Sequence, residues 1–192
     1  MGRSPACGRR THRGRLDKYS VGQGAAQGQR TCEEREVETV KALSLWQPHA
    51  IAIGLGLKPF ETRGWSTNYR GQLAIHAAKK KFRQIDYPWD YFKQVKVRLQ
   101  AKEQALWALD YGKIICVCDL VDCTPVTNLR GRIGDAEFWG DFSDNGDDGK
   151  WRYAFKLENV RLIAVEKRPL VVGRQGFFNV PDELLPEERR GR

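Results

Sequence analysis

The strongest constraint on the fold comes from Ile114 to Val121, a stretch that is apolar on both of its alternating faces. A strand with this pattern belongs in the centre of a sheet that is covered on both sides. Further extended segments are predicted at Ala42–Trp46, Pro59–Arg63, Leu73–Ala77, Trp151–Leu157 and Gly176–Val180. Because helices lie between them without a repeating strand–helix unit, the pattern favours an α+β barrel over a doubly wound sheet.

Two segments carry the signals of helices. Pro48 to Leu55 is predicted to be a short helix, since proline is tolerated in a first helical turn and Gly56 is typical of a helix end. Residues 79–110 change to helical spacing and predict a longer packing helix. Its apolar stripe lies between lysine-rich faces and is formed by Phe92, Val95, Leu99 and Leu106. Residues 127–149 are predicted to be a polar excursion.

A chain of 192 residues can form one well-buried core with tails. Residues 1–38 are rich in Gly, Arg and Gln and have no apolar periodicity, which predicts a disordered basic arm. Met1 is the only methionine and globular patterning begins at Val40, so we hypothesise that the natural protein starts at Val37 or Val40. The domain itself is expected over residues 39–185, followed by a charged tail at 186–192.

The chain is basic, with 33 Lys and Arg against 24 Asp and Glu and a net charge of +9. Residues 1–38 account for only part of this excess, so the folded part is itself basic. Such a surplus favours polyanionic partners, although many basic proteins simply have a solvated positive surface. No apolar run is long enough to span a membrane, and the first residues lack the apolar centre of a secretory signal. We expect a cytoplasmic protein.

The cysteines are odd in number and widely spaced, which predicts reduced thiols rather than a disulfide scaffold: Cys7, Cys32, Cys116, Cys118 and Cys123. Cys116 and Cys118 share one face of the central strand, whereas Cys123 has the opposite parity unless a bulge intervenes. The histidines have no zinc spacing. Residues 141–146 begin like a calcium loop, but Arg152 stands where a bidentate glutamate is needed. We expect no metal and no cofactor.

A set of motifs carries a resemblance to a known family. It begins with Leu43–Pro48, continues with a glycine, a lysine, a glutamate and an arginine at fixed spacing, and ends with Trp65 and Tyr69–Gly71; the spaced residues are Gly56, Lys58, Glu61 and Arg63. The sequence resembles the ASCH domain of the PUA-like superfamily, of the bacterial and phage type. Later segments, residues 153–160 and 173–176, are also similar. The resemblance implies a pseudobarrel of five to six strands with a cleft beside the first helix, and recognition of RNA, DNA or modified nucleosides.

The spacing of the motif lets its charged side chains converge. On an extended segment Glu61 and Arg63 project to the same side, and Lys58 lies at the junction between helix and strand. Lys58 and Arg63 can bind a phosphate or a carbonyl oxygen, while Glu61 accepts hydrogen bonds from a base or orients Lys58. The alternative is a structural ion pair at a barrel rim.

Some members of the family are amidohydrolases of acetylated cytidine, in which a lysine, a threonine and a glutamate cooperate. Lys58 matches the lysine, but Glu61 stands at the threonine position, which weakens the enzymatic interpretation. Thr62 should point away from the cleft. Glu158 is a possible second carboxylate, or a solvated strand residue. Lys58 and Glu61 are the catalytic candidates if the protein is a hydrolase.

Aromatic and basic residues around the motif suit a nucleic acid. Trp46, Trp65 and Tyr69 are candidates for base stacking, with Trp46 expected to be the one buried in the core. Further cations are candidate backbone contacts, or a solvated surface: Arg70, Lys79, Lys80, Lys81, Arg83 and, by resemblance, Arg174. His76 is expected to be a packed strand residue. The leading hypothesis is a module that binds RNA, single-stranded nucleic acid or a nucleotide-like small molecule; the alternatives are a hydrolase of a modified nucleoside or RNA and a protein-interaction module.

Overall fold

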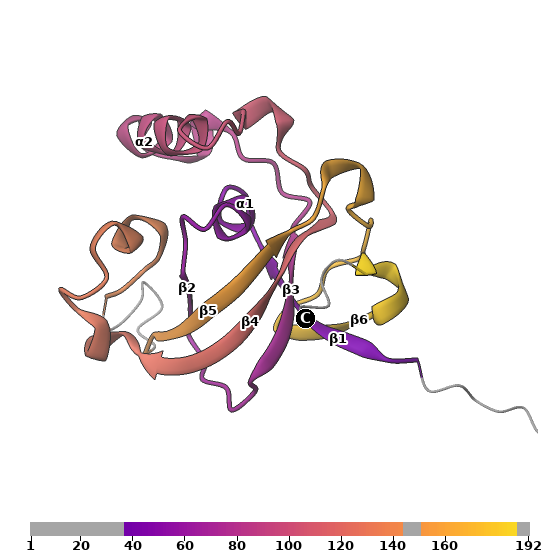
Figure 1. Ribbon diagram of the computed structural model, residues 1–192. Helices are drawn as coiled ribbons and strands as arrows, with labels where there is room; N and C mark the ends of the chain where they lie inside the picture. Colours follow the sequence, from indigo (N-terminus) through magenta and orange to yellow (C-terminus); the bar gives the residue numbers. More distant parts are fainter. Residues whose placement is uncertain (1–36, 144–150, 188–192) are drawn as a thin grey trace, which may run out of the picture. The chain divides into compact units, whose positions relative to one another are not determined.

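The computed structural model describes residues 37–143 and 151–187. The predicted arm and charged tail lie almost entirely outside these ranges. The described residues form six strands and two α-helices: β1 (Thr39–Leu45), α1 (His49–Gly54), β2 (Phe60–Arg63), β3 (Gly71–Ala77), α2 (Trp89–Gln100), β4 (Lys113–Pro125), β5 (Tyr153–Leu162) and β6 (Phe177–Pro181) (Figure 1). Short 3-10 helices join them: η1 (Gln84–Asp86), η2 (Leu106–Ala108), η3 (Val126–Leu129), η4 (Gly134–Trp139), η5 (Val165–Lys167) and η6 (Asp182–Leu184).

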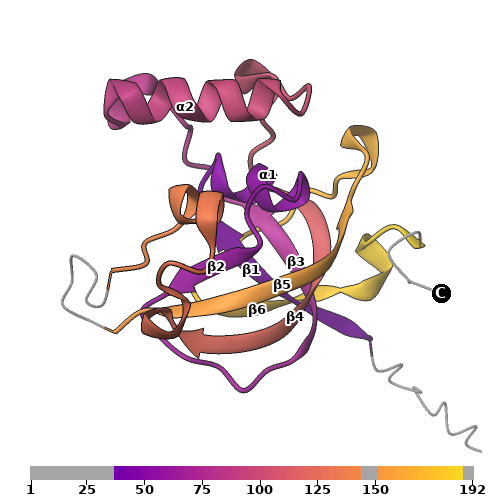
Figure 2. The same ribbon diagram turned by 60° about the vertical axis from the view of Figure 1, so that its left-hand side comes forward.

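The strands make one mixed sheet in the order β2-β5-β4-β3-β1-β6. Strands β1 and β3 are parallel, and the other neighbours are antiparallel. The sheet curves strongly, but β2 and β6 remain its two edges and it does not close into a barrel (Figure 2). The α+β class and the number of strands therefore agree with the sequence prediction.

Strand β4 lies inside the sheet, and residues 114–118 and Leu120 are buried, as the composition predicted, whereas Val121 at the end of the predicted stretch is 37% exposed. Ile115, Cys116, Cys118 and Leu120 belong to the larger apolar core on the side of α1. Ile114 and Val117 belong to a second core with residues of β1 and β6. Two cores, one on each side, explain why this stretch has no polar face.

The register of β4 on β5 shifts twice, between Val117 and Asp119 and between Leu120 and Asp122. The bulges change the parity of the strand, so Cys123 packs against the same core as Cys116 and Cys118. The thiols of these three cysteines are unpaired.

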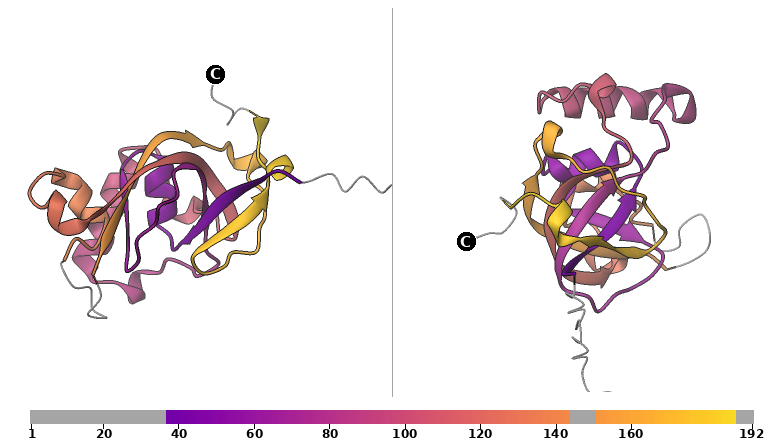
Figure 3. Two further views of the ribbon diagram at one scale, coloured as in Figure 1. Left: turned by 90° about the horizontal axis from the view of Figure 1, so that it is seen from below. Right: turned by 90° about the vertical axis from the view of Figure 1, so that its right-hand side faces the viewer.

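Helix α1 packs against the sheet, and α2 lies beyond α1 on the same side, farther from the sheet (Figure 1 and Figure 3). The predicted helix over residues 79–110 is too long, because α2 covers only Trp89–Gln100. Pro88 disfavours a helical conformation at the residue before it, and Glu103 adopts a positive φ of 58° beyond the other end. Val95 and Leu99 are the buried residues of α2, as predicted. No helix of the described ranges has both the length and the apolar character needed to cross a bilayer.

Candidate functional site

A cavity of about 430 Å³ opens where the end of β1, the start of α1, strand β2 and the segment after η4 meet. We call it the first cavity. Its lining includes all three charged residues of the predicted motif together with several aromatic side chains: Ser44, Leu45, Trp46, His49, Lys58, Glu61, Thr62, Arg63, Tyr91, Phe138, Trp139, Gly140 and Asp141.

The charged side chains of the motif form a linked triad. Lys58 Nζ lies 3.0 Å from Glu61 Oε2, and Arg63 Nε lies 2.9 Å from Glu61 Oε1. The side chains of Lys58 and Glu61 are only 3% and 8% exposed, while that of Arg63 is 24% exposed. The triad is thus part of a concave wall.

Backbone carbonyls from two other segments hold the triad in place. Lys58 Nζ donates a hydrogen bond to the carbonyl of Trp139, and Arg63 Nη2 donates one to the carbonyl of Ser44 at 2.9 Å. The pairing of β6 on β1 ends at Leu43, so the carbonyl of Ser44 is available to a side chain. Arg63 therefore connects β2 to β1, two strands that are not neighbours in the sheet.

Electrostatics keep Glu61 ionised inside the cavity. Burial by itself raises the pKa of this carboxyl, but the charges of Lys58 and Arg63 outweigh burial and hold the pKa below the ordinary value of 4.5. The triad consequently carries one net positive charge, because the carboxylate neutralises one of the two cations.

His49 also lines the first cavity, although no pattern in the sequence indicated it. Burial and the charge of Lys58 lower the pKa of His49 to about 4, although Glu61 and the backbone of Trp139 act in the opposite direction. The imidazole is therefore neutral at pH 7. Its Nδ1 is buried and has no hydrogen-bond partner among the described residues. Its place at the first turn of a predicted helix gave no signal of a cavity residue.

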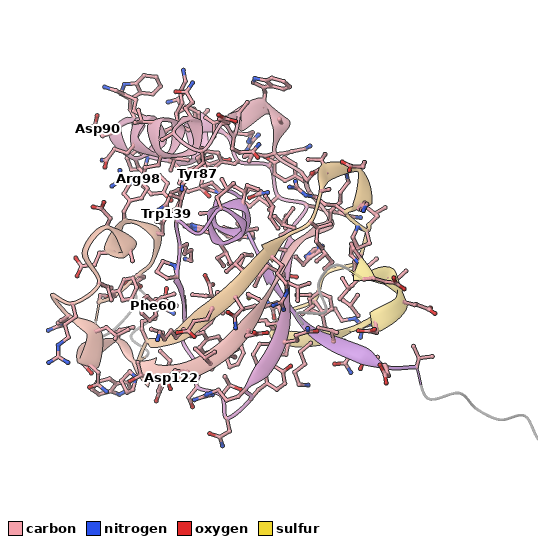
Figure 4. All side chains as sticks on the ribbon, viewed as in Figure 1. Phe60, Tyr87, Asp90, Arg98, Asp122 and Trp139 are labelled. Atoms are coloured by element: carbon pink, nitrogen blue, oxygen red, sulfur yellow. The ribbon has the colours of Figure 1, made fainter. Side chains whose placement is uncertain are left out.

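The aromatic wall comes from the stretch that was predicted to be a polar excursion. Trp139, which is labelled in Figure 4, is buried, and its ring meets that of His49 edge-on with 6.4 Å between ring centres. Phe138 stacks on Tyr91 of α2 with 5.1 Å between ring centres. The adjacent aromatic residues Phe138 and Trp139 were the available signal that this stretch packs against the fold.

The structure corrects the burial predicted for Trp46 and shows where the other two candidate aromatic residues lie. Trp46 was expected to be buried, but it is 54% exposed and lines the first cavity. Trp65 packs edge-on against Phe155 and Phe177 of the core, and Tyr69 also packs against Phe177. Neither Trp65 nor Tyr69 lines the cavity, because the chain after β2 turns these rings toward the core.

The predictions for Thr62 and Glu158 also had different outcomes. Thr62 was predicted to point away from the cleft, yet it lines the first cavity and its Oγ1 accepts a hydrogen bond from the amide of Asp141 at 3.2 Å. The segment after η4 passes over this edge strand and makes both faces part of the wall. Glu158 is an exposed residue paired with Lys156, so it is the solvated strand residue of the two alternatives.

The predicted basic residues are divided between different places. Arg70 pairs with Asp122 at 3.3 Å, and Figure 4 shows Asp122 apart from Trp139, at the lower edge of the molecule in that view. Lys80 Nζ lies over the ring of Trp46 at 3.7 Å. Lys79 and Arg174 line a separate, second cavity.

The described ranges contain no group of three or more His, Cys, Asp or Glu side chains placed to hold a metal ion. The groups that the first cavity offers to a ligand are instead an ion-paired triad, a neutral imidazole and aromatic rings.

Comparison with known proteins finds one family. The ASCH domain model matches residues 43–167, which is more than half of the chain. Similar solved structures include ASCH from Zymomonas mobilis, with 18% identity, a TM-score of 0.45, and coverage of 75% of this chain and 89% of that chain. Two single-substitution variants of that protein match at the same identity and TM-score, with 91% and 89% of their chains covered. A comparison with curated protein sequences gives no match. The family match includes the glycine–lysine–glutamate–arginine motif that builds the first cavity, and the chain belongs to the ASCH domain family.

Proposed function

We propose that this protein binds RNA, or a nucleotide-like small molecule, and that the first cavity receives a nucleobase. ASCH domains are generally thought to bind RNA, which is the background of the proposal. The observation that carries it is the combination of a buried charged triad and aromatic walls in one cavity.

The size and lining of the cavity suit a base. Ligand pockets typically have volumes of roughly 300–1,000 Å³, and the first cavity, at about 430 Å³, lies within that range. Bases in single-stranded RNA stack on exposed aromatic rings. Trp46, which is 54% exposed and lines the cavity, supplies such a ring at the opening, while Tyr91 and Phe138 stack on each other and form part of the aromatic wall.

The polar groups of the cavity suit the edge of a base better than a phosphate. Lys58 and Arg63 are already paired with Glu61, so they attract a dianion less strongly than two unpaired cations would. The triad can still donate to a carbonyl oxygen, and the Glu61 carboxylate can accept from an exocyclic amine. The neutral His49 adds a further polar group.

Binding measurements with a matched pair of tryptophan variants test this proposal. We expect single-stranded RNA to bind at low salt and Trp46→Ala to weaken binding about tenfold, since base stacking contributes about 1–3 kcal/mol. Trp107→Ala is the control, because Trp107 is 90% exposed and does not line the cavity. The proposal fails if neither RNA, single-stranded DNA nor nucleosides bind at low salt, or if both variants weaken binding equally.

A hydrolase acting on a modified nucleoside is the second candidate. It is favoured by the meeting of an ammonium group, a carboxylate and a neutral imidazole in one cavity, from Lys58, Glu61 and His49. Incubation with acetylated cytidine and with RNA is the assay. Product formation that is lost in both Lys58→Ala and His49→Ala would support this candidate, and a full rate in either variant would refute the assignment.

A further inference from the structure

A second cavity, of about 340 Å³, lies next to the first. Its lining combines the ends of β1 and β3 with the loop before β6: Ser44, His76, Ala78, Lys79, Val172, Gly173, Arg174 and Gln175. Ser44 lines both cavities, so one residue separates them.

The charge of the second cavity differs from that of the first. Its lining has two cations, Lys79 and Arg174, and contains no carboxylate. Neither cation is ion-paired with an acidic side chain in the part of the chain that the structure describes. In the first cavity, by contrast, Glu61 neutralises one charge of the triad. Of the two cavities, the second is therefore the one in which a dianion binds with the more favourable electrostatic energy.

The walls of the second cavity are held by the core and do not depend on the ligand. His76 is buried; its Nδ1 lies 3.0 Å from Ser44 Oγ and its Nε2 lies 3.1 Å from the carbonyl of Val171. The amide of Val171 donates to the carbonyl of Gly112 at 2.9 Å. These contacts fix the loop that carries Arg174.

Gly173 permits close packing at one wall, whereas Gly112 is favoured by its backbone, which has a φ of +70°. A Cβ at Gly173 would lie 2.4 Å from the ring of His76 and 2.5 Å from Ser44 Oγ, so only glycine fits there. The stem of Lys79 lies along Gly112, where a Cβ would be 3.4 Å from two of its methylene carbons. The backbone thus places Lys79 on one side of the cavity and the Arg174 loop on the other.

We infer that the second cavity binds the phosphate group of the nucleotide whose base occupies the first cavity. This inference rests on the proposed function and names its ligand more closely as a phosphorylated nucleoside, free or within a single strand. Arginine and lysine are the usual partners of phosphate oxygens, and the neighbouring cavities allow base and phosphate to bind at once. Lys80, whose Nζ lies over the ring of Trp46, adds a cation beside the first cavity.

Paired titrations of nucleosides and their 5′- and 3′-monophosphates, for the four standard bases and acetylated cytidine, test the inference. We expect at least one monophosphate to bind about tenfold more tightly than its nucleoside at low salt, because hydrogen bonds to charged groups are among the stronger ones. In the double variant Lys79→Ala/Arg174→Ala this gain should disappear while the affinity for the nucleoside stays the same. Inorganic phosphate should compete with the monophosphate and leave nucleoside binding unchanged.

The control removes the same charge elsewhere. Lys93→Ala/Lys96→Ala takes two cations from the exposed side of α2, outside both cavities, and should leave the phosphate gain intact. An equal loss in both double variants would mean that only the overall charge matters and would overturn the inference.

The results separate the two proposals. If nucleosides bind but phosphates add nothing, or if the gain survives in Lys79→Ala/Arg174→Ala, the second cavity is not a phosphate site and the proposed function stands. If neither nucleosides, monophosphates nor single-stranded RNA bind, both proposals fail. Parallel titrations with a single-stranded trinucleotide distinguish a free nucleotide from a strand as the source of the phosphate, since a strand should bind more tightly than any monophosphate.

Discussion

Glu61 is the residue on which the first cavity depends, because its carboxylate contacts both Lys58 and Arg63. A buried ion pair is weak evidence for stability as a whole, since the cost of removing the charges from water offsets their attraction. Removing one partner is different, because the remaining charges are left buried without compensation.

We therefore predict that Glu61→Gln destabilises the fold by about 3–5 kcal/mol, the usual effect of breaking a buried pair. Urea denaturation at pH 7 measures this change. Glu158→Gln is the matched control, because Glu158 pairs with Lys156 on the surface at 2.7 Å and should change stability by at most about 1 kcal/mol. Similar losses in the two variants would contradict a special role of the buried triad.

His49 is predicted to make stability depend on pH. Its pKa is about 4 in the folded protein against 6.5 as the ordinary value. The unfolded chain binds the proton between these two values and the folded protein does not, so the free energy of unfolding decreases as the pH falls from 6.5 toward 4. The decrease due to this residue is at most about 3 kcal/mol.

Urea denaturation of wild type and His49→Gln between pH 7.5 and pH 4.5 checks the prediction. The variant should lose less stability over this range. His76 acts in the same direction, because burial lowers its pKa, so some dependence on pH remains in the variant. Identical slopes for wild type and variant would show that His49 is protonated to the same extent in the folded and unfolded states.

At the scale of elements, irregular segments complete a site that the sheet begins. Strand β2 presents Glu61 and Arg63 of the triad, but η4 and the residues after it supply the Trp139 carbonyl and much of the aromatic wall. Loop residues 171–175 likewise complete the second cavity against β1 and β3. Strand β2 fixes the position of Glu61 and Arg63, whereas the irregular segments carry Lys58, Lys79 and Arg174 and shape the cavities.

Gly173→Ala is the prediction that belongs to this scale. The added methyl group cannot fit against His76 and Ser44, so the loop must move outward at a cost of about 1–3 kcal/mol, as in other overpacked sites. We expect the phosphate gain to fall and nucleoside binding to persist. Thermal denaturation and the paired titrations measure the two effects. Leu170→Ala, at an exposed position of the same connection, should change neither; a full phosphate gain in Gly173→Ala would contradict the loop's role.

At the scale of the whole molecule, a net charge of +9 favours any polyanion and cannot by itself select one. Selection depends on where charges remain unpaired. Arg70, Arg83 and Lys156 are each paired with a neighbouring carboxylate, whereas Lys79 and Arg174 face a cavity that has none. The local arrangement of the charges, more than the net charge, should determine how a nucleic-acid strand binds.

The salt dependence of RNA binding tests this view. For single-stranded nucleic acid, the slope of log affinity against log salt changes by about 0.7 for each phosphate contact. Lys79→Ala/Arg174→Ala should therefore make the slope shallower by about 0.7 or more, which corresponds to one lost phosphate contact or more. Arg70→Ala should leave the slope nearly unchanged. Equal reductions in the two variants, measured by filter binding over a series of salt concentrations, would argue for a diffuse electrostatic surface.

The sequence by itself determined the parts of this protein that depend on neighbours along the chain. A run that is apolar on both faces identified the buried part of strand β4, because a strand covered on both sides exposes no face to water. The spacing of Lys58, Glu61 and Arg63 predicted their convergence, since residues two apart on an extended segment share a side. The same motif identified the family.

Only the tertiary structure decided which side chains face a cavity and which face the core. Among Trp46, Trp65 and Tyr69 the sequence favoured Trp46 as the buried ring, yet Trp46 lines the first cavity and the other two pack against the core. Trp139 approaches Lys58 from 81 positions away, and Val171 approaches His76 from 95. Such contacts join segments that are distant along the chain, so no local pattern encodes them, and they define both cavities.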